Sequence, residues 1–524
     1  MLSVVIFNIW VSQPIFMYIY HMFVRKKKNK SGIISIQIID KSTGNYKVLK
    51  TIGSSSDENE ISELYQQGKD WIKEKQGLLE LDFTNAKKQT EEIIDQIEQI
   101  NRIGTELLLG KIYDDIGFKL IDEDLLKKLV LLRLTDPASK LKTLDLLSKY
   151  HSITIDVHKV YRYLDKLYKE QKDLIQQISY NHTLKILGGQ ISAVFYDVTT
   201  LYFQIDDEDD IRKRGFSKEG KHQNPQILLG LLVSVDGYPL AYEIFEGNKF
   251  EGHTMLPIVD AFKNKYNIDK LIIIADSGLL SNQNITELQE KGYDFIVGAR
   301  IKNEKKKIRD KILGLCLKNG ESGIVEKSTD LQLIISYSNK RAKKDKYNRE
   351  RGLARLEKLL KSGKLTKSNI NNRGYNKYLK MDGMIKVSIS REKFEDDARW
   401  DGLKGYVTNT NLSKDEILEN YGHLWKIEKA FRISKHDLKI RPIYHRLQRR
   451  IEAHITINFV AYKIYKELER LLRLKKTKIS PEKAIDIAKT IYAVKVRISN
   501  KNQYIYKTLL LNSEQKWLAD LFGF

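Results

Sequence analysis

The sequence predicts an α/β protein with a mixed-sheet core, a basic β-containing insertion in that core, and a mainly helical N-terminal region preceded by a small β-hairpin. Three observations support this fold class. Near-continuous apolar runs alternate with helical patterns between residues 189 and 300. Basic residues are concentrated in residues 301–380, where 23 Lys and Arg outnumber 8 Asp and Glu. Helical periodicity dominates both flanks, at residues 81–188 and after residue 411.

The composition indicates a globular protein with a polyanionic partner. The chain has 524 residues, of which 41% are hydrophobic and 30% charged, and its net charge is +23. This excess of basic residues favours nucleic acid as the partner, and the alternative is a basic protein from an AT-rich genome. The single cysteine, Cys316, excludes an intrachain disulfide and a multi-cysteine zinc site. A reducing, cytoplasmic location fits this cysteine usage.

The first 24 residues are apolar and uncharged, and the basic run RKKKNK follows them. Read literally, they form a membrane anchor with a basic cytoplasmic flank. Asn8, Gln13, Pro14 and His21 interrupt that pattern, and a cleaved signal peptide would need a basic start and a small-residue cleavage site. We therefore expect residues 1–21 to be a non-native or disordered extension, Met22 to be the true start, and no stable membrane association.

Residues 22–80 are predicted to hold a β-hairpin and a helix. In IISIQIIDKSTGNYKVLKTIG, residues 33–53, two alternating runs flank the turn KSTGN. Ser and Asp residues that follow can cap a helix ending near Gly77. Residues 81–188 then show short helical stretches, which we expect to bind DNA. Either they contain a DNA-reading helix-turn-helix or they form a plain helical bundle, and the sequence does not decide between the two.

The core elements follow in order from residue 189. ISAVFYDVTTLYF, residues 191–203, predicts a strand, and residues 225–245 predict two strands around the hairpin dipeptide Asp236-Gly237. A helix, the apolar strand KLIIIADSG, a capped helix and the strand DFIVGAR complete the first part of the core through residue 300.

The insertion, residues 301–410, contains four short strand-like runs around a basic helix. We expect it to contact the DNA backbone, although a run of charges is also typical of a solvated face.

The second part of the core, residues 411–475, is predicted to be helical, and residues 476–524 are predicted to form a helical C-terminal tail. Ser413 can cap a helix that continues through residues 421–435. At 100° per residue, one stripe of this helix holds Tyr421, Trp425, Glu428, Arg432 and Lys435. The neighbouring stripe can anchor the helix on the sheet through Leu424, Ile427, Phe431 and Leu438. The alternative is an amphipathic surface helix with an ion pair between Glu428 and Arg432.

Two aspartates carry the predicted chemistry. Asp197 ends the apolar run ISAVFYD, and Asp276 ends LIIIAD. The carboxyl ends of such strands form the ligand-binding crevice of open α/β sheets, and paired carboxylates there favour Mg²⁺ or Mn²⁺. The alternative is that each aspartate caps the turn that follows it. Glu428 would complete the metal site, while neighbouring cations would hold phosphates and aromatic residues would stack on a displaced base.

These features together resemble the DDE transposases of bacterial insertion sequences. The resemblance covers residues 190–470 and includes the motifs YDVTT, ADSG and YGHLWKIEKAFRISK. It points to the branch with a Tyr-Arg-Glu-Lys signature and to its long-transposase subgroup, since Tyr421, Glu428 and Lys435 have the signature's spacing. Leu424 stands where the signature has its arginine, so we assign the phosphate-holding role to Arg432 instead.

The resemblance implies an RNase H-like core and cut-and-paste transposition, with metal-dependent cleavage at the element's ends and strand transfer into target DNA. It implies that Asp197, Asp276 and Glu428 are catalytic and hold two Mg²⁺ or Mn²⁺ ions per active site. The implied assembly is a homodimer that pairs the terminal inverted repeats of double-stranded DNA in a synaptic complex.

Six further residues are predicted to contact DNA: Tyr421, Trp425, Arg432, Lys435, Arg300 and Arg441. Tyr421 is expected to orient a phosphate, and Trp425 is expected either to stack on an extruded base or to pack in the core. Supporting roles near the site are expected for Thr199, Ser277 and His222.

Two other functions remain open from the sequence. One is a different RNase H-like metal-dependent DNA nuclease or recombinase that uses the same carboxylates, and the other is a non-catalytic, transposase-derived DNA-binding protein. The basic insertion and the Tyr–Glu–Lys helix favour a transposase over the first. The intact acidic triad favours it over the second.

Overall fold

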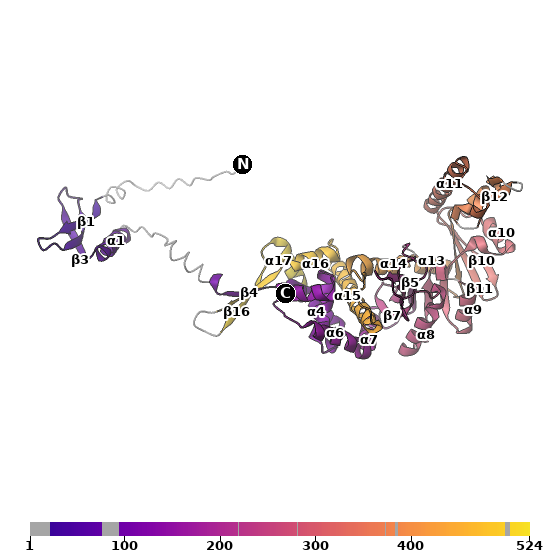
Figure 1. Cartoon of the computed structure of the whole chain (residues 1–524), viewed down its shortest axis with the longest axis horizontal. Coiled ribbons are helices and arrows are strands. Elements are labelled where there is room, and N and C mark those ends of the chain that lie inside the picture. The colour runs from indigo at the N-terminus through magenta and orange to yellow at the C-terminus, as the bar shows by residue number, and fades with distance from the viewer. Residues whose placement is uncertain are drawn as a thin grey trace. The chain divides into compact units, whose positions relative to one another are not determined.

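The computed structural model describes residues 21–75, 94–217, 220–279, 281–371, 374–382, 386–497 and 503–524 (Figure 1). It divides into two compact units, Met1–Ile97 and Glu98–Phe524, which are described separately. Apart from residue 21, the predicted N-terminal extension lies outside the described residues. Over the described ranges, no helix is both long enough and apolar enough to cross a bilayer.

The first unit is a three-stranded antiparallel sheet covered by one helix. Strands β1 (Met22–Lys28), β2 (Ile34–Asp40) and β3 (Lys47–Ser55) lie in that order, and helix α1 (Glu58–Lys75) packs on them. The hairpin predicted over residues 33–53 is confirmed as β2 and β3. Strand β1 was not predicted, because its run of lysines is compatible with a strand only at the edge of a sheet, where charged side chains stay in water.

An eight-stranded mixed sheet is the centre of the second unit. Its strand order is β10-β11-β14-β9-β8-β5-β6-β7. Five of these strands were predicted in the first part of the core: β5 (Ala193–Tyr202), β6 (Gln226–Ser234), β7 (Pro239–Glu246), β8 (Ile272–Ala275) and β9 (Asp294–Ala299). Strand β8 runs parallel to its neighbours β5 and β9, whereas the other neighbouring pairs are antiparallel.

Side chains of this sheet alternate between two apolar cores, one on each face. On β5, Phe195 and Leu201 belong to one core, while Val194 and Tyr196 belong to the other. Helices α8 (Met255–Tyr266) and α9 (Asn282–Glu290) contribute to the second core. Burial on both faces is the reason that these strands are apolar along nearly their whole length.

A 27-residue helix, α15 (Gln448–Leu474), joins the sheet to the helical region that precedes it in sequence. Every residue from Ile451 to Tyr465 on this helix is buried. Helix α15 contacts four of the earlier helices: α3 (Lys111–Ile116), α4 (Asp124–Thr135), α6 (Val157–Lys166) and α7 (Lys172–Ile186). Figure 1 shows the purple helices α4, α6 and α7 beside the orange and yellow α15, although they lie far apart in the sequence. Helix α5 (Lys140–His151) packs against α6.

Two stretches that were predicted to be helical contain strands. Residues 97–102 form β4 (Ile97–Arg102), and the C-terminal tail contains β15 (Tyr492–Arg497) and β16 (Tyr504–Leu509) between α16 (Pro481–Lys489) and α17 (Ser513–Phe522). These strands form one sheet in the order β16-β15-β4. The β-branched and aromatic residues of YAVKVR and YIYKTL favour strands, and pairing with β4 from a distant part of the chain completes the sheet. Residues 81–93 lie outside the described residues.

The insertion extends the core sheet and adds a small subdomain. After α10 (Lys306–Gly314), strands β10 (Ser322–Ser328), β11 (Leu331–Tyr337) and β14 (Leu403–Thr408) continue the sheet beyond β9. The predicted basic helix is α11 (Asn339–Lys361), and the subdomain also contains β12 (Leu379–Asp382), β13 (Lys386–Ile389) and α12 (Arg391–Ala398). Its apolar core holds Leu356, Tyr378, Leu379 and Val387.

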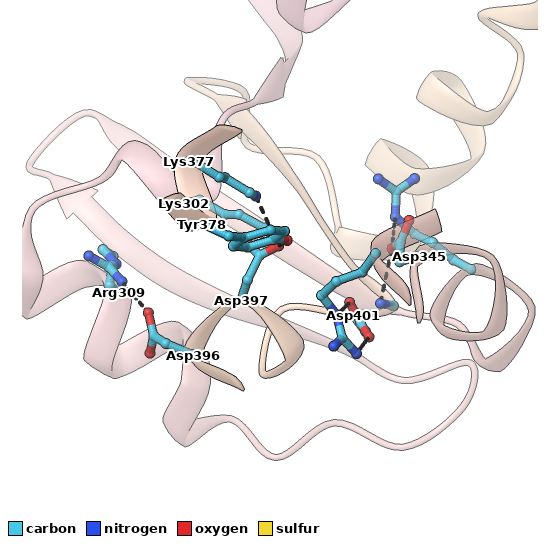
Figure 2. Close-up of polar contacts among 11 residues, drawn as sticks. Lys302, Arg309, Asp345, Lys377, Tyr378, Asp396, Asp397 and Asp401 are labelled. Atoms are coloured by element: carbon cyan, nitrogen blue, oxygen red, sulfur yellow. Dashed lines mark hydrogen bonds and ion pairs between the residues drawn. The ribbon is translucent and has the colours of Figure 1, made fainter. Parts of the chain in front are cut away.

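Polar contacts hold this subdomain against the core sheet. Asp397 of α12 accepts hydrogen bonds from Lys302 at 2.6 Å, from Lys377 at 2.9 Å and from Tyr378 at 2.5 Å (Figure 2). Lys302 follows β9 in the core, so this carboxylate links the two parts. Burial acts to raise the pKa of Asp397, but the three donors outweigh burial and hold the pKa at about 2.

Replacing Asp397 with Asn is expected to lower the free energy of unfolding by about 2 kcal/mol at pH 7, because the folded-state pKa lies well below the ordinary 3.8. The stabilisation is fully present above about pH 4 and is lost as the pH falls through about 2. Denaturant unfolding between pH 7 and pH 2 should therefore show the difference between wild type and variant shrinking over the acidic range.

Asp396→Asn is the matched control for this measurement, since Asp396 has a side chain 47% exposed and a 3.5 Å contact with Arg309. It should change stability by less than about 0.5 kcal/mol. Equal losses for the two variants at every pH would contradict the role assigned to Asp397.

Candidate active site

The parallel pairing of β5 with β8 places Asp197 and Asp276 next to each other. The last pair of this ladder joins Tyr196 to Ala275, so the following residue on each strand is one of the two aspartates. Asp276 directly follows the end of β8 and is exposed, while Asp197 is half-buried. The strand predicted over residues 191–203 is confirmed as β5, but Asp197 lies inside it, and the expectation that Asp197 occupies the carboxyl end of a strand is wrong. Strand β5 continues to Tyr202 because β6 pairs with it along its whole length, beyond the point where β8 stops.

Tyr421 connects helix α13 (Lys414–Gly422) to Asp276. Its hydroxyl donates a hydrogen bond to Oδ1 of Asp276 at 3.2 Å, and the residue is only 4% exposed. Gly298 of β9 provides the space for this contact. A Cβ atom at Gly298 would lie 2.5 Å from the Tyr421 hydroxyl oxygen and 3.0 Å from the backbone nitrogen of Ser277. Burial, followed by the negative charge of Asp276, raises the pKa of Tyr421, so the hydroxyl stays protonated and donates.

Lys404 of β14 is a site residue that the sequence reasoning missed. Its ammonium lies 4.5 Å from the centroid of the Tyr421 ring. Burial, and then the charge of Arg341, lower the pKa of Lys404, while the charges of Asp276 and Glu428 oppose that shift. Two of the predicted catalytic carboxylates therefore favour the charged form of this one lysine. Its position in the sequence carries no signal of that role, because β14 reaches the site only through its pairing with β9.

The single helix predicted over residues 421–435 is interrupted twice. Helix α13 ends at Gly422, α14 (Trp425–Arg432) begins after a short turn, and Ile433–Asp437 form a π-helical turn. The predicted stripe is therefore wrong as a continuous line, since the assumed 100° per residue does not hold across these breaks. Trp425, Glu428 and Arg432 are exposed, whereas Tyr421 is buried and Lys435 is half-buried.

The anchoring face of these helices is confirmed. All four apolar residues predicted to hold the helix on the sheet are buried: Leu424, Ile427, Phe431 and Leu438. Ser413 begins α13 with a capping box that it shares with Glu416, as its position predicted. The alternative pairing between Glu428 and Arg432 is not observed in the described part of the chain, although both residues belong to it. Trp425 is 53% exposed, so it is not a core residue.

The other predicted residues have separate environments. Arg300 directly follows β9, is exposed, and lines a cavity of about 580 Å³ with Lys302, Arg341 and Lys404. The guanidinium of Arg441 lies 5.3 Å from the ring centroid of Tyr202, the last residue of β5.

The three supporting residues also differ in their surroundings. Ser277 adjoins Asp276, and Thr199 is buried in β5, two residues beyond Asp197. His222 lies between β5 and β6, where its Nδ1 accepts a hydrogen bond from the backbone N–H of Ser217 at 3.2 Å. That contact gives His222 a structural role in its loop.

The carboxylate oxygens of Asp197, Asp276 and Glu428 suit a hard divalent cation, although they are not gathered around one point. Across the residues that the structure describes, no group of three or more His, Cys, Asp and Glu side chains is placed to hold a metal ion. The strand register makes Asp197 and Asp276 neighbours. The charges of Asp276 and Glu428 both interact with Lys404. A set of carboxylate oxygens without sulfur or imidazole ligands fits Mg²⁺ or Mn²⁺.

Comparison with known proteins identifies the family. Residues 188–464 match the family model described as a transposase DDE domain. The comparison with curated proteins gives no match.

Two kinds of solved transposase structure are similar to this chain at low identity. The piggyBac transposase in a synaptic complex with hairpin DNA is 9% identical, with a TM-score of 0.37 over 74% of this chain and 78% of that chain. The Mos1 transposase in a paired-end complex with the left transposon end is 11% identical, with a TM-score of 0.15 over 35% of this chain and 57% of that chain. A Mos1 mariner paired-end complex with Mn has the same values. Since these scores are low, the assignment depends on the family model alone.

The matched region covers more than half of the 524 residues. It runs from just before β5 into α15, so it includes the central sheet, the insertion and the helices that carry Tyr421 and Glu428. The three carboxylates predicted from the sequence all lie inside it. The chain therefore belongs to the transposase DDE domain family and is a DNA transposase.

Proposed function

We propose that this protein is the transposase of a bacterial insertion sequence and that Asp197, Asp276 and Glu428 are its catalytic residues. In this proposal it cleaves DNA at the ends of its element and transfers those ends into target DNA. The observation that carries the proposal is the register of β5 and β8, which places Asp197 beside Asp276 where β8 ends. The order β7-β6-β5-β8-β9, with an antiparallel half and a parallel half, supports an RNase H-like core.

The three carboxylates would hold two Mg²⁺ or Mn²⁺ ions, which when bound activate the attacking water or 3′-hydroxyl and stabilise the leaving oxygen. The chain's own residues prepare this site. Tyr421 orients the carboxylate of Asp276 through its hydroxyl, and Gly298 leaves room for that hydroxyl. Lys404 places a positive charge near Asp276 and Glu428, which lowers the repulsion between them.

The exposed side chains around α14 suit a DNA strand. Trp425 presents an aromatic ring on which an unpaired base could stack, and Arg432 presents a cation one helical turn beyond Glu428. Leu424 is 7% exposed and packs in the core, so it takes no part in holding a phosphate. We propose that Arg432, which is exposed, has the phosphate-holding role of the signature arginine.

The DNA contacts we propose extend to Arg300, Lys435, Arg441 and the basic helix α11. Arg300 is exposed beside β9, and Arg441 lies against the end of β5. Because cut-and-paste transfer joins both ends of an element to one target, we also propose a homodimer that pairs the two terminal inverted repeats.

Glu428→Gln tests the catalytic assignment. With Mg²⁺ and DNA that carries the sequences flanking the gene, strand transfer should fall at least about 100-fold, because a metal-binding charge is lost. Binding to the end DNA should be retained, as measured by gel shift. Glu419→Gln, at an exposed position of α13, is the matched control and should keep wild-type activity. Cleavage by Glu428→Gln at the wild-type rate would exclude Glu428 as a catalytic residue.

Gly298→Ala tests the orientation of Asp276. The added methyl group would push against the Tyr421 hydroxyl, so strand transfer should fall by about tenfold and stability by about 1–3 kcal/mol. Gly278→Ala is the matched control, since a Cβ there meets no atom of the described residues within 4 Å.

Tyr421→Phe removes the hydrogen bond to Asp276 without adding volume, and it should reduce strand transfer with a smaller loss of stability, about 1 kcal/mol. Thermal unfolding and strand-transfer assays measure both effects. If Gly298→Ala behaved like Gly278→Ala, the contact between Tyr421 and Asp276 would not be needed for activity.

A further inference from the structure

A second cavity, of about 630 Å³, lies between the beginning of α5 and the segment that leads into α15. Its lining is cationic. Among the described residues that line it there is no carboxylate, and there are five basic side chains: Arg133, Lys140, Lys142, Lys439 and Arg441. Tyr161, Tyr444, His445 and His454 contribute ring systems to the walls. A cavity of this size is large enough for a small ligand, and this lining selects for an anion.

Lys140 is the central observation. The residue is 5% exposed, and within the described part of the chain its ammonium has no hydrogen bond or ion pair. Three groups interact electrostatically with Lys140: Arg133, His445 and His454. Arg133 is cationic, and the two histidines become cationic on protonation. Burying an unpaired ammonium beside other cations is strongly unfavourable, so this cavity is electrostatically incomplete without an anion.

Two carboxylates close in sequence to the cavity walls, those of Asp136 and Asp165, are engaged elsewhere. Asp136 pairs with Arg102 at 2.7 Å and with Lys489 at 3.5 Å. Asp165 accepts from Arg449 at 2.8 Å and from Arg450 at 3.1 Å. These aspartates therefore already have basic partners. Asp145 pairs with Lys142 at 3.4 Å where both side chains are exposed, whereas Lys140 and Arg133 have no ion pair among the described residues.

The walls of the cavity are held in place by Arg133. Its guanidinium donates to the carbonyl of Ala138 at 2.9 Å on one side and to the carbonyl of Lys439 at 3.4 Å on the other. Its Nε is buried and has no hydrogen-bond partner among the residues that the structure describes. The N-terminus of α5, where Ser139 accepts the backbone N–H of Lys142, forms part of the same wall and adds the positive end of a helix dipole.

We propose that this cavity is a phosphate-binding site, in which Lys140, Arg133 and the N-terminus of α5 bind a phosphate group. The source we favour is a DNA strand, an assignment that rests on the proposed transposase function. Arg441 supports it, because this residue lines the cavity and also lies against Tyr202 at the end of β5, the strand that carries Asp197. A free phosphate ion or a nucleotide would offer the same phosphate group to this site.

The test uses the full-length protein and three variants: Lys140→Met, Lys142→Met and the control Lys149→Met. Lys149 is exposed on the same helix and does not line the cavity. Inorganic phosphate should raise the unfolding midpoint of the wild type and of Lys149→Met above that in sodium chloride of equal ionic strength. Lys140→Met should lose that response. Without phosphate, Lys140→Met should unfold at the same temperature as the wild type or higher, because an unpaired buried charge is removed while the aliphatic stem is kept.

Binding of a fluorescent single-stranded oligonucleotide identifies the source of the phosphate. If the source is DNA, Lys140→Met should bind about tenfold more weakly than Lys149→Met, Lys142→Met should lose less, and inorganic phosphate should compete. A phosphate response with unchanged oligonucleotide binding would assign the site to a free phosphate compound and overturn the DNA assignment. A phosphate response equal in Lys140→Met and wild type, or a lower midpoint for Lys140→Met without phosphate, would overturn the site itself. Activity of Glu428→Gln reports on the catalytic proposal separately, since that residue does not line this cavity.

Discussion

The parallel pairing of β5 with β8 is the constraint on which the rest of this site depends. Both strands are buried on both faces, so a slip of one residue would exchange the side chains that belong to the two apolar cores. Packing therefore enforces the register that places Asp197 beside Asp276. The same packing positions β9, whose Gly298 admits the Tyr421 hydroxyl, and so the apolar core determines where the polar groups of the site can meet.

The insertion is part of this arrangement because its strands join the core sheet. Strand β14 lies next to β9 and delivers Lys404 to the surroundings of Asp276 and Glu428. The subdomain beyond it is tied to the core through Asp397 and Lys302. A segment that looks like an interruption in the sequence thus supplies a residue, Lys404, to the surroundings of Asp276 and Glu428.

Helix α15 and the segment before it connect α14, which carries Glu428, to the helical region at the beginning of the second unit. The chain passes from Glu428 on α14 through a π-helical turn to Arg441 and His445, and then enters α15. Along this path the exposed groups of the site give way to the cationic cavity around Lys140. Both features use the same scaffold, because the long buried face of α15 packs against the sheet and against α4, α6 and α7.

The sequence by itself determined the elements whose signals are local. Apolar runs predicted β5 to β9, the pattern of a capped helix predicted α9, the cap at Ser413 predicted the start of α13, and helical spacing predicted the buried face of α14. Only the tertiary structure decided which elements meet. The pairing of β14 with β9, the contact of Tyr421 with Asp276, the breaks between α13 and the π-helical turn, and the sheet of β4, β15 and β16 all depend on partners far away in the chain. Local periodicity does not encode such partners, because they are selected by the burial of complementary faces in the folded protein.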